Sequence, residues 1–261
     1  MKVFKILSIA LLVCSVFACK KETDQVVLSD FQPDGANLKV IYASSYILRD
    51  SIQIKINDVR VSNTFLGNST TNLPTPFPGG GLNTGGDNRP FYLSVKPGDT
   101  KILVSVPKKL TTVDSIIRFT GQANLEARKY YSAYLTDTIP TSRLVLVEDN
   151  LSPVDTGVSR FKFVNLIPNV AALDVYFDTV KVASNVAYGT ASPEFTLRRN
   201  TTGQFVLRDA GSLPTSPIVA RYPSTAAVFT IPNQRVMTVF AKGYKGGTLA
   251  RTPVVSLLFN K

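Results

Sequence analysis

The sequence predicts an all-β protein, with two tandem antiparallel β-sandwich domains after a cleaved lipoprotein signal peptide. From Leu38 onward, short apolar runs recur between Gly, Pro, Asn and Asp turns, and few helical periods occur. The order of these runs in the first half of the chain returns in the second half. The N-terminus combines a basic start, an apolar stretch and a cysteine, which is typical of exported lipoproteins.

The N-terminal segment predicts cleavage before Cys19 and a lipid on its sulfur. Lys2 and Lys5 supply the basic start, and Ile6–Ala18 is an apolar segment of thirteen residues. This is shorter than the roughly 20 residues that span a bilayer. Phe17 departs from the pattern, because small or hydroxyl residues are commoner there. Plain secretion and a retained anchor are the alternatives.

The residues after the cysteine indicate where the lipoprotein resides. Lys20 to Asp24 are charged or polar, and no aspartate follows Cys19 directly to signal inner-membrane retention. We therefore expect a protein anchored in the cell outer membrane by its N-terminal lipid, because two or three acyl chains give stable anchoring. The periplasmic and surface faces of that membrane both stay open.

The composition argues against an enzyme and against a cofactor. The chain has no histidine and no tryptophan, which excludes Ser-His-Asp and Cys-His catalysis and removes the commonest zinc and copper ligands. Cys14 leaves with the signal and Cys19 carries lipid, so no disulfide can form. A glycosidase needs two carboxylates, and the glutamates beyond the tether, Glu126, Glu148 and Glu194, form no pair in the sequence.

The charge is basic but scattered. The formal net charge of +11 falls to +9 when Lys2 and Lys5 leave with the signal. Pairs such as Lys108-Lys109 and Arg198-Arg199 lie outside any basic helix or nucleic-acid motif, so we expect no nucleic-acid partner. Solvated strand faces, or a patch that meets acidic glycans, are the remaining interpretations.

The repeat rests on matching strands. Each half has an opening strand, a hairpin on a two-residue polar turn and two later strands. In the first half these are Leu38–Tyr42, Ile52–Ile56 with Val59–Val61, Tyr130–Tyr134 and Arg143–Val147. In the second they are Phe161–Asn165, Leu173–Phe177 with Val180–Val182, Val236–Phe240 and Val254–Leu258. The hairpins alternate, which predicts buried Ile or Val on one face and solvated Lys, Arg or Asp on the other.

These strands divide the chain into four parts. Glu148–Gly157 is polar and carries the Pro and Gly of a linker. The expected parts are a signal peptide over 1–18, a lipidated tether over 19–35, and domains over 36–150 and 158–261.

Several motifs closely resemble the domain-of-unknown-function 4397 family. The second half carries the family's arginine-aromatic-valine-asparagine start at Arg160–Asn165, its strand at Leu173–Tyr176 and its turn at Asn185–Gly189. In the first half, Val95–Thr100 and Lys129–Tyr131 are similar to its central turn and tyrosine strand. The resemblance covers most of 37–261 and implies Ig-like β-sandwiches on extracytoplasmic bacterial proteins that adhere or bind polymers. It implies no catalytic residue.

Two departures from the family concern loops. Arg198–Gly203 replaces a shorter turn, and the first half has an insertion, Asn72–Pro90. Its glycine-rich centre, residues 74–88, lacks the lysine ending of a phosphate-binding loop, so we expect a surface loop whose deletion leaves folding intact. Phe77, held between prolines, is a candidate ligand contact.

Two further candidate sites remain open at this point. Tyr130 and Tyr134 share one strand face while Tyr131 points to the other, where it either packs across strands or stacks on a sugar. The acidic side chains of Glu148, Asp149 and Asp155 gather oxygen ligands near the linker, where they either hold an interdomain calcium ion or are solvated.

The expected function is therefore non-catalytic. We expect a lipid-anchored cell-envelope protein that acts as a binding or adhesion module, whose partner is a surface polysaccharide or an envelope protein. The alternative is a carbohydrate-binding accessory lipoprotein of an outer-membrane uptake system.

Overall fold

The computed structural model describes residues 33–45, 50–67, 72–138 and 141–261. The predicted signal peptide and Cys19 lie outside the described residues. The described chain forms β-strands and one short 3₁₀ turn, η1 (Leu249–Arg251), with no α-helix among these residues. The prediction of an all-β fold is confirmed. Within the described ranges, no helix has the length and apolar character needed to cross a membrane.

The first half contains two sheets that enclose one hydrophobic core. The inner sheet has the order β11-β10-β1-β5, with β7 also on β1, and the outer sheet has the order β3-β2-β8-β9, with β4 on β2. Their strands are β1 (Ala36–Tyr42), β2 (Ser51–Ile56), β3 (Val59–Arg60), β4 (Phe65–Leu66), β5 (Thr75–Phe77), β7 (Leu93–Val95), β8 (Gly98–Pro107), β9 (Asp114–Leu125), β10 (Tyr130–Thr136) and β11 (Arg143–Glu148).

The second half contains its own pair of sheets and core. The inner sheet has the order β15-β12-β20-β21-β6, the outer one β14-β13-β17-β18, and β16 pairs with β19. Their strands are β12 (Val158–Leu166), β13 (Ala172–Phe177), β14 (Val180–Ala187), β15 (Phe195–Arg198), β16 (Thr202–Gly203), β17 (Phe205–Asp209), β18 (Ala220–Tyr222), β19 (Phe229–Thr230), β20 (Val236–Lys242) and β21 (Val254–Phe259), joined by β6 (Gly81–Leu82) from the first half.

The same central strand pairings occur in each half. In each inner sheet the opening strand pairs in parallel with a late strand, β1 with β10 and β12 with β20. The prediction of antiparallel sheets is therefore wrong for the inner sheets, which are mixed, because the long chain between these strands returns the late strand in the same direction. In each half the last strand then pairs antiparallel with that late strand. Both predicted hairpins are present, and Asn57, Asp58 and Asp178 have the positive φ that such tight turns need.

The predicted solvated face of the hairpin strands is wrong at Lys55 and Asp174, whereas Lys181 is exposed as expected. Lys55 is 9 % exposed, because it reaches under the start of β9 and forms an ion pair with Asp114 at 2.8 Å. Asp174 is 1 % exposed, and its carboxylate accepts hydrogen bonds from Lys181 Nζ at 2.6 Å and from the backbone N–H of Asn185 at 2.8 Å. Lys55 and Asp174 are thus buried and paired.

The expectation of a surface loop at residues 74–88 is also wrong. β5 pairs antiparallel with β1 in the first half, and β6 pairs antiparallel with β21 in the second half. Gly81 permits the second pairing, since a Cβ there would lie 1.8 Å from the carbonyl oxygen of Leu257. The insertion is therefore a strap that completes both inner sheets.

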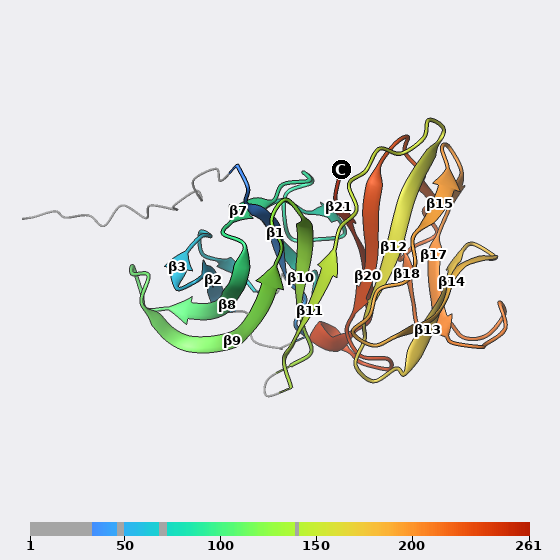
Figure 1. The fold of residues 1–261 in the computed structure, drawn as a ribbon. Coiled ribbons are helices and arrows are strands. Elements are labelled where there is room, and N and C mark those ends of the chain that lie inside the picture. Colours follow the sequence, from blue (N-terminus) through green and yellow to red (C-terminus); the bar gives the residue numbers. More distant parts are fainter. Residues whose placement is uncertain (1–32, 46–49, 68–71, 139–140) are drawn as a thin grey trace, which may run out of the picture.

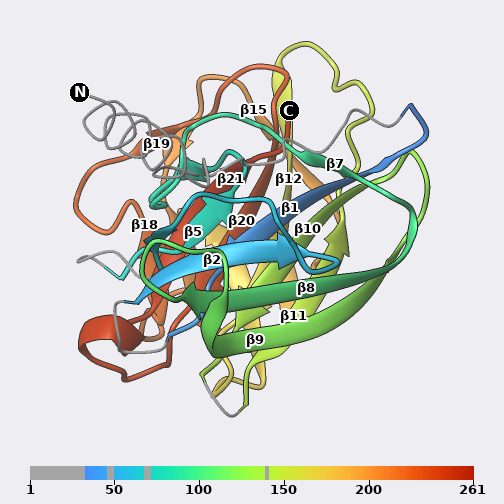
Figure 2. The same cartoon turned by 90° about the vertical axis from the view of Figure 1, so that its left-hand side faces the viewer.

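The two inner sheets pack face to face and make the molecule four layers deep. In Figure 1 the blue and green first half lies against the yellow to red second half, with β10 and β11 facing β12 and β20. Figure 2 shows β2, β8 and β9 running side by side in the outer sheet of the first half. A third core fills the junction between the halves, formed by Ile41, Ala43, Tyr134, Val145, Val147, Val164, Leu166, Phe240 and Leu258.

Candidate functional site

A hollow of about 350 Å³, here called the seam hollow, opens where the strap meets the second half. Leu82 lies on its strap side because β6 is hydrogen-bonded along β21. Asn83 reinforces this pairing, since its Nδ2 donates to the carbonyl of Val255 at 2.7 Å. Phe229 approaches from β19 and Phe259 from the end of β21. Segments far apart in the chain thus build one cavity.

The chemistry of the seam hollow is apolar with a basic rim. Its floor includes Leu82, Phe229 and Phe259, and exposed Arg235 and Lys261 contribute cationic side chains. Lys261 Nζ donates to the carbonyl of Leu151 at 3.0 Å, so Arg235 is the cation with greater freedom to meet a ligand. The side chains that line the hollow include no carboxylate. This arrangement suits a ligand with an apolar face and an anionic or hydrogen-bonding edge.

Phe77 lies in the strap, in strand β5. Its ring stacks on Phe65 at 6.5 Å with an interplanar angle of 10°, and it is half-buried against the first core. It also lines a second hollow of about 290 Å³. The structure thus places this predicted contact residue at a cavity edge, partly used for packing.

Tyr131 lies inside the first core. The predicted faces are right, because Tyr131 points into that core while Tyr134 points into the junction between the halves. Tyr131 is only 5 % exposed, and its hydroxyl accepts a hydrogen bond from the backbone N–H of Glu126 at 3.2 Å. Tyr130 is half-buried and makes an edge contact with Tyr92. A ligand cannot stack on Tyr131 in this arrangement.

The three acidic residues near the linker are not brought together. Glu148 is exposed and pairs with Lys129 at 3.1 Å, Asp149 is buried, and Asp155 is exposed farther along. No group of three or more acidic, cysteine or histidine side chains that could hold a metal ion occurs in the described part of the chain.

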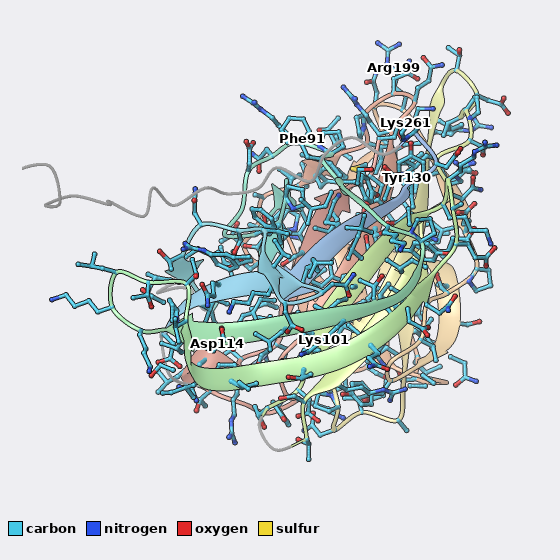
Figure 3. The ribbon with its side chains drawn as sticks, turned by 60° about the vertical axis from the view of Figure 1, so that its left-hand side comes forward. Phe91, Lys101, Asp114, Tyr130, Arg199 and Lys261 are labelled. Atoms are coloured by element: carbon cyan, nitrogen blue, oxygen red, sulfur yellow. The ribbon has the colours of Figure 1, made fainter. Side chains whose placement is uncertain are left out.

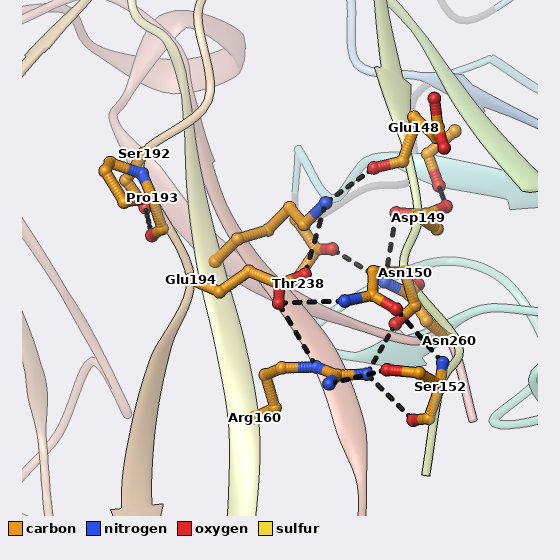
Figure 4. A network of polar contacts seen from close by, with 12 residues as sticks. Glu148, Asp149, Asn150, Ser152, Arg160, Ser192, Pro193, Glu194, Thr238 and Asn260 are labelled. Atoms are coloured by element: carbon orange, nitrogen blue, oxygen red, sulfur yellow. Dashed lines mark hydrogen bonds and ion pairs between the residues drawn. The ribbon is translucent and has the colours of Figure 1, made fainter. Parts of the chain in front are cut away.

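Instead, cationic side chains of the second half hold this linker (Figure 4). Arg160 Nη2 donates to the carbonyl of Asn150 at 2.8 Å and to that of Ser152 at 2.9 Å. Lys162 Nζ donates to the carbonyl of Glu148 at 2.5 Å. Glu194 completes the network, accepting from Asn150 Nδ2 at 3.1 Å and lying 3.4 Å from Arg160 Nε. The linker is therefore fixed to β12.

At one end of the junction, Asp149 is buried among hydroxyl and amide donors. Its carboxylate accepts hydrogen bonds from Ser132 at 2.6 Å, Tyr92 at 3.0 Å and Asn260 at 3.2 Å. Burial raises the pKa of the Asp149 carboxyl, and these partners together with nearby cations oppose the increase. Asn260 comes from the second half, so this carboxylate couples the two halves.

Lys39 belongs to the same polar end. Its Nζ donates to the carbonyl of Phe259 at 2.7 Å and lies 4.4 Å from the centre of the Tyr92 ring. Burial lowers the pKa of Lys39 to about 8, and the negative charge of Asp149 limits that decrease. The lysine thus joins β1 to the end of β21.

Lys242 is buried at the opposite end of the junction. Its Nζ donates to Asn72 Oδ1 at 2.9 Å and to the carbonyl of Ser44 at 3.1 Å. Burial lowers the pKa of the Lys242 amine to about 7. Since Asn72 begins the strap and Tyr92 follows it, the strap runs from one polar end of the junction to the other.

Sequence reasoning missed the residues of the seam hollow and the junction. Leu82, Phe229 and Phe259 carry no shared local motif, so no sequence signal brings them together. A signal for the junction does exist: Val236–Lys242 is a nearly continuous apolar run, which is typical of a strand buried on both faces. That run predicts a covered face for Lys242.

The comparisons with known proteins locate one family match. No curated protein matches the chain. The matching family model, described as Domain of unknown function (DUF4397), covers residues 88–176. This stretch begins just before β7, crosses the linker and ends within β13, so it takes strands from both halves. The chain thus contains one DUF4397 domain at residues 88–176.

Proposed function

We propose that this protein is a lipid-anchored cell-envelope protein whose two Ig-like sandwiches form one rigid, non-catalytic binding module. The seam hollow carries the proposal, because it is a cavity with an aromatic floor and a cationic rim. The common strand order of the halves supports tandem sandwich domains over 36–150 and 158–261. The shared third core and the strap support a rigid module that presents one surface.

The lipid anchor rests on the sequence before Cys19. Replacing Cys19 by Ala should abolish the incorporation of radiolabelled fatty acid into the protein when it is made in growing cells. Cys14→Ala is the matched control and should leave this labelling intact. Equal labelling of the protein with and without Cys19 contradicts lipid anchoring.

The alternative function is a carbohydrate-binding accessory lipoprotein of an outer-membrane uptake system. Phe229 and Phe259 favour it, because aromatic rings offer apolar faces on which sugar rings pack. An adhesion module would instead bind an envelope protein or a surface polysaccharide. The two functions differ in whether the ligand is a soluble oligosaccharide.

Glycan arrays and bacterial cells, probed with the chain from residue 20 onward, separate these functions. Arg235→Ala and Thr230→Trp alter the rim of the seam hollow at exposed positions, and each should weaken binding at least about tenfold. Thr120→Trp, exposed on β9, is the matched control. Selective oligosaccharide binding favours uptake, whereas binding to cells alone favours adhesion. Binding that neither rim variant changes contradicts a role for the seam hollow.

A further inference from the structure

A third hollow, of about 240 Å³, lies at the free end of the β8–β9 hairpin and is strongly basic. Its lining includes three cationic and three hydroxyl side chains, those of Arg60, Lys108, Lys109, Ser51, Thr64 and Thr111. The lining contains no carboxylate. Cations and hydroxyl donors that converge in this way match the oxygen-rich, negatively charged surface of a phosphate group.

Hydrogen bonds order the backbone of the hairpin turn, which carries Lys108, Lys109 and Thr111. The backbone N–H of Lys108 donates to the carbonyl of Val113 at 2.8 Å, and that of Thr111 donates to the carbonyl of Lys108 at 3.1 Å. Arg60 is 9 % exposed, with its Nε donating to the carbonyl of Ser62 at 2.8 Å. Because the turn and the guanidinium are already ordered, a ligand pays little entropy to bind there.

The same turn exposes apolar side chains. Leu110 is 93 % exposed at its tip, and Val113 and Ile117 are 53 % and 58 % exposed nearby. The turn projects from the body of the molecule beyond the start of β9, close to the labelled Asp114 (Figure 3). Projecting apolar side chains beside paired lysines are the combination that binds the surface of an anionic bilayer.

We propose that the β8–β9 tip binds the phosphate group of an anionic lipid headgroup, with Lys108 and Lys109 on the phosphate and Leu110 at the acyl boundary. A soluble phosphate shares the headgroup chemistry, but it gives no reason for the exposure of Leu110. The thirteen residues from 20 to 32 span at most about 45 Å, so an anchor at Cys19 keeps the folded part near the membrane. The proposal requires neither that anchor nor a ligand in the seam hollow.

Sedimentation with lipid vesicles tests the proposal on the chain from residue 20 onward. This chain lacks the lipid, and it keeps every described strand, since these begin at Ala36. Vesicles of phosphatidylcholine with phosphatidylglycerol should bind the protein, and vesicles of phosphatidylcholine alone should bind it much more weakly. Replacing Lys108 and Lys109 by Ser should weaken binding to anionic vesicles about thirtyfold, because each lysine near such a surface contributes a factor of about five.

Two further variants separate a site from general charge attraction. Replacing Arg198 and Arg199 by Ser makes the same charge change at an exposed pair in the second half and should leave vesicle binding nearly unchanged. Leu110→Ser keeps the charge and should weaken vesicle binding without altering the response to inorganic phosphate. Equal losses from the lysine pair and the arginine pair overturn the proposal.

Inorganic phosphate, titrated while backbone amide resonances of 108–111 are followed, distinguishes the two sources of the phosphate group. Shifts at these amides together with binding to anionic vesicles support the lipid headgroup. The same shifts without vesicle binding overturn the lipid and leave a soluble phosphate. The absence of both the amide shifts and the vesicle binding overturns the site altogether.

Discussion

The two polar ends of the junction between the halves use the same residue type in different surroundings. At one end Lys39 lies in the field of a buried carboxylate, Asp149, and at the other Lys242 donates to the neutral groups of Ser44 and Asn72. Burial lowers both pKa values, to about 8 for Lys39 and about 7 for Lys242. The negative charge beside Lys39 accounts for the smaller decrease.

This difference assigns separate roles to the two ends. At the Asp149 end, the buried carboxylate accepts hydrogen bonds from donors of both halves. Removing either side of such a buried ionic pair leaves a charge or a donor without a partner, so this end stabilises the contact between the halves. A buried ammonium carries a desolvation cost at every pH at which it is charged, and burial is what lowers the pKa of Lys242. The Lys242 end is therefore the end whose contribution to stability depends most on pH.

Removing the strap should abolish the distinction between the ends and produce the largest effect. Deleting residues 74–88 takes away β5 and β6 and frees Asn72 and Tyr92 from their positions at the two ends. We expect the free energy of unfolding to fall by about 5 kcal/mol, at the upper limit of what single changes do. Urea denaturation measures it. A deletion variant as stable as the parent protein would show that the strap is only a surface loop.

Breaking the Asp149 end alone should have the next largest effect. Asp149→Ala leaves the donors of Tyr92, Ser132 and Asn260 without their common acceptor, and it leaves Lys39 without its counter-charge. The expected loss is about 3 to 5 kcal/mol in the free energy of unfolding. Asp149→Asn is the control, since its amide oxygen still accepts hydrogen bonds and its loss should be smaller. Equal losses from both variants contradict a role for the charge.

The hairpins and central strands follow from local sequence, whereas the junction does not. Val59 and Val180 begin strands just after polar two-residue turns, and this spacing alone predicts each hairpin. Alternation also predicts a solvent face, which fails at Lys55 and Asp174 because other segments cover them. Period-two patterning reports which side chains share a face but not what covers that face.

The candidate sites show the same division. The faces of Tyr130, Tyr131 and Tyr134 were predictable from strand spacing, but the burial of Tyr131 depends on the outer sheet that packs over it. The seam hollow depends on the pairing of β6 with β21, in which partners such as Leu82 and Leu257 are distant in sequence. Glycine-rich composition at residues 79–81 indicates a loop, and only the close approach to Leu257 reveals a strand.

Replacing the buried ammonium at the other end should have a smaller effect of opposite sign. Lys242→Met removes a charge that burial disfavours, so at pH 6 we expect the variant to be more stable by about 1 kcal/mol. The pKa of Lys242 falls from 10.5 to about 7 on folding, so the unfolded chain binds more protons between these values. The stability contribution of Lys242 in the parent protein therefore rises with pH over this window and is flat below it.

The advantage of Lys242→Met should consequently shrink as the pH rises from 7 toward 10.5. Melting temperatures of both proteins across this range give the measurement. Lys39 supplies a comparison. Its pKa in the folded protein is about 8, so its contribution to stability begins to rise at a higher pH than that of Lys242. An advantage that stays constant from pH 7 to pH 10 would mean that Lys242 keeps its ordinary pKa in the folded protein.

Calcium should produce the smallest effect of all. Because Glu148 pairs with Lys129 and Asp149 is enclosed by Ser132, Tyr92 and Asn260, the linker carboxylates already have protein partners. Asp155 lies apart from them, so these carboxylates do not form the multidentate oxygen shell that calcium requires. Melting curves recorded with calcium and with a chelator should coincide, for the parent protein and for Glu148→Gln alike. A melting temperature that rises with calcium in the parent but not in Glu148→Gln would show that the Asp149 end opens to bind a cation, which would make that end an adjustable contact instead of a fixed one.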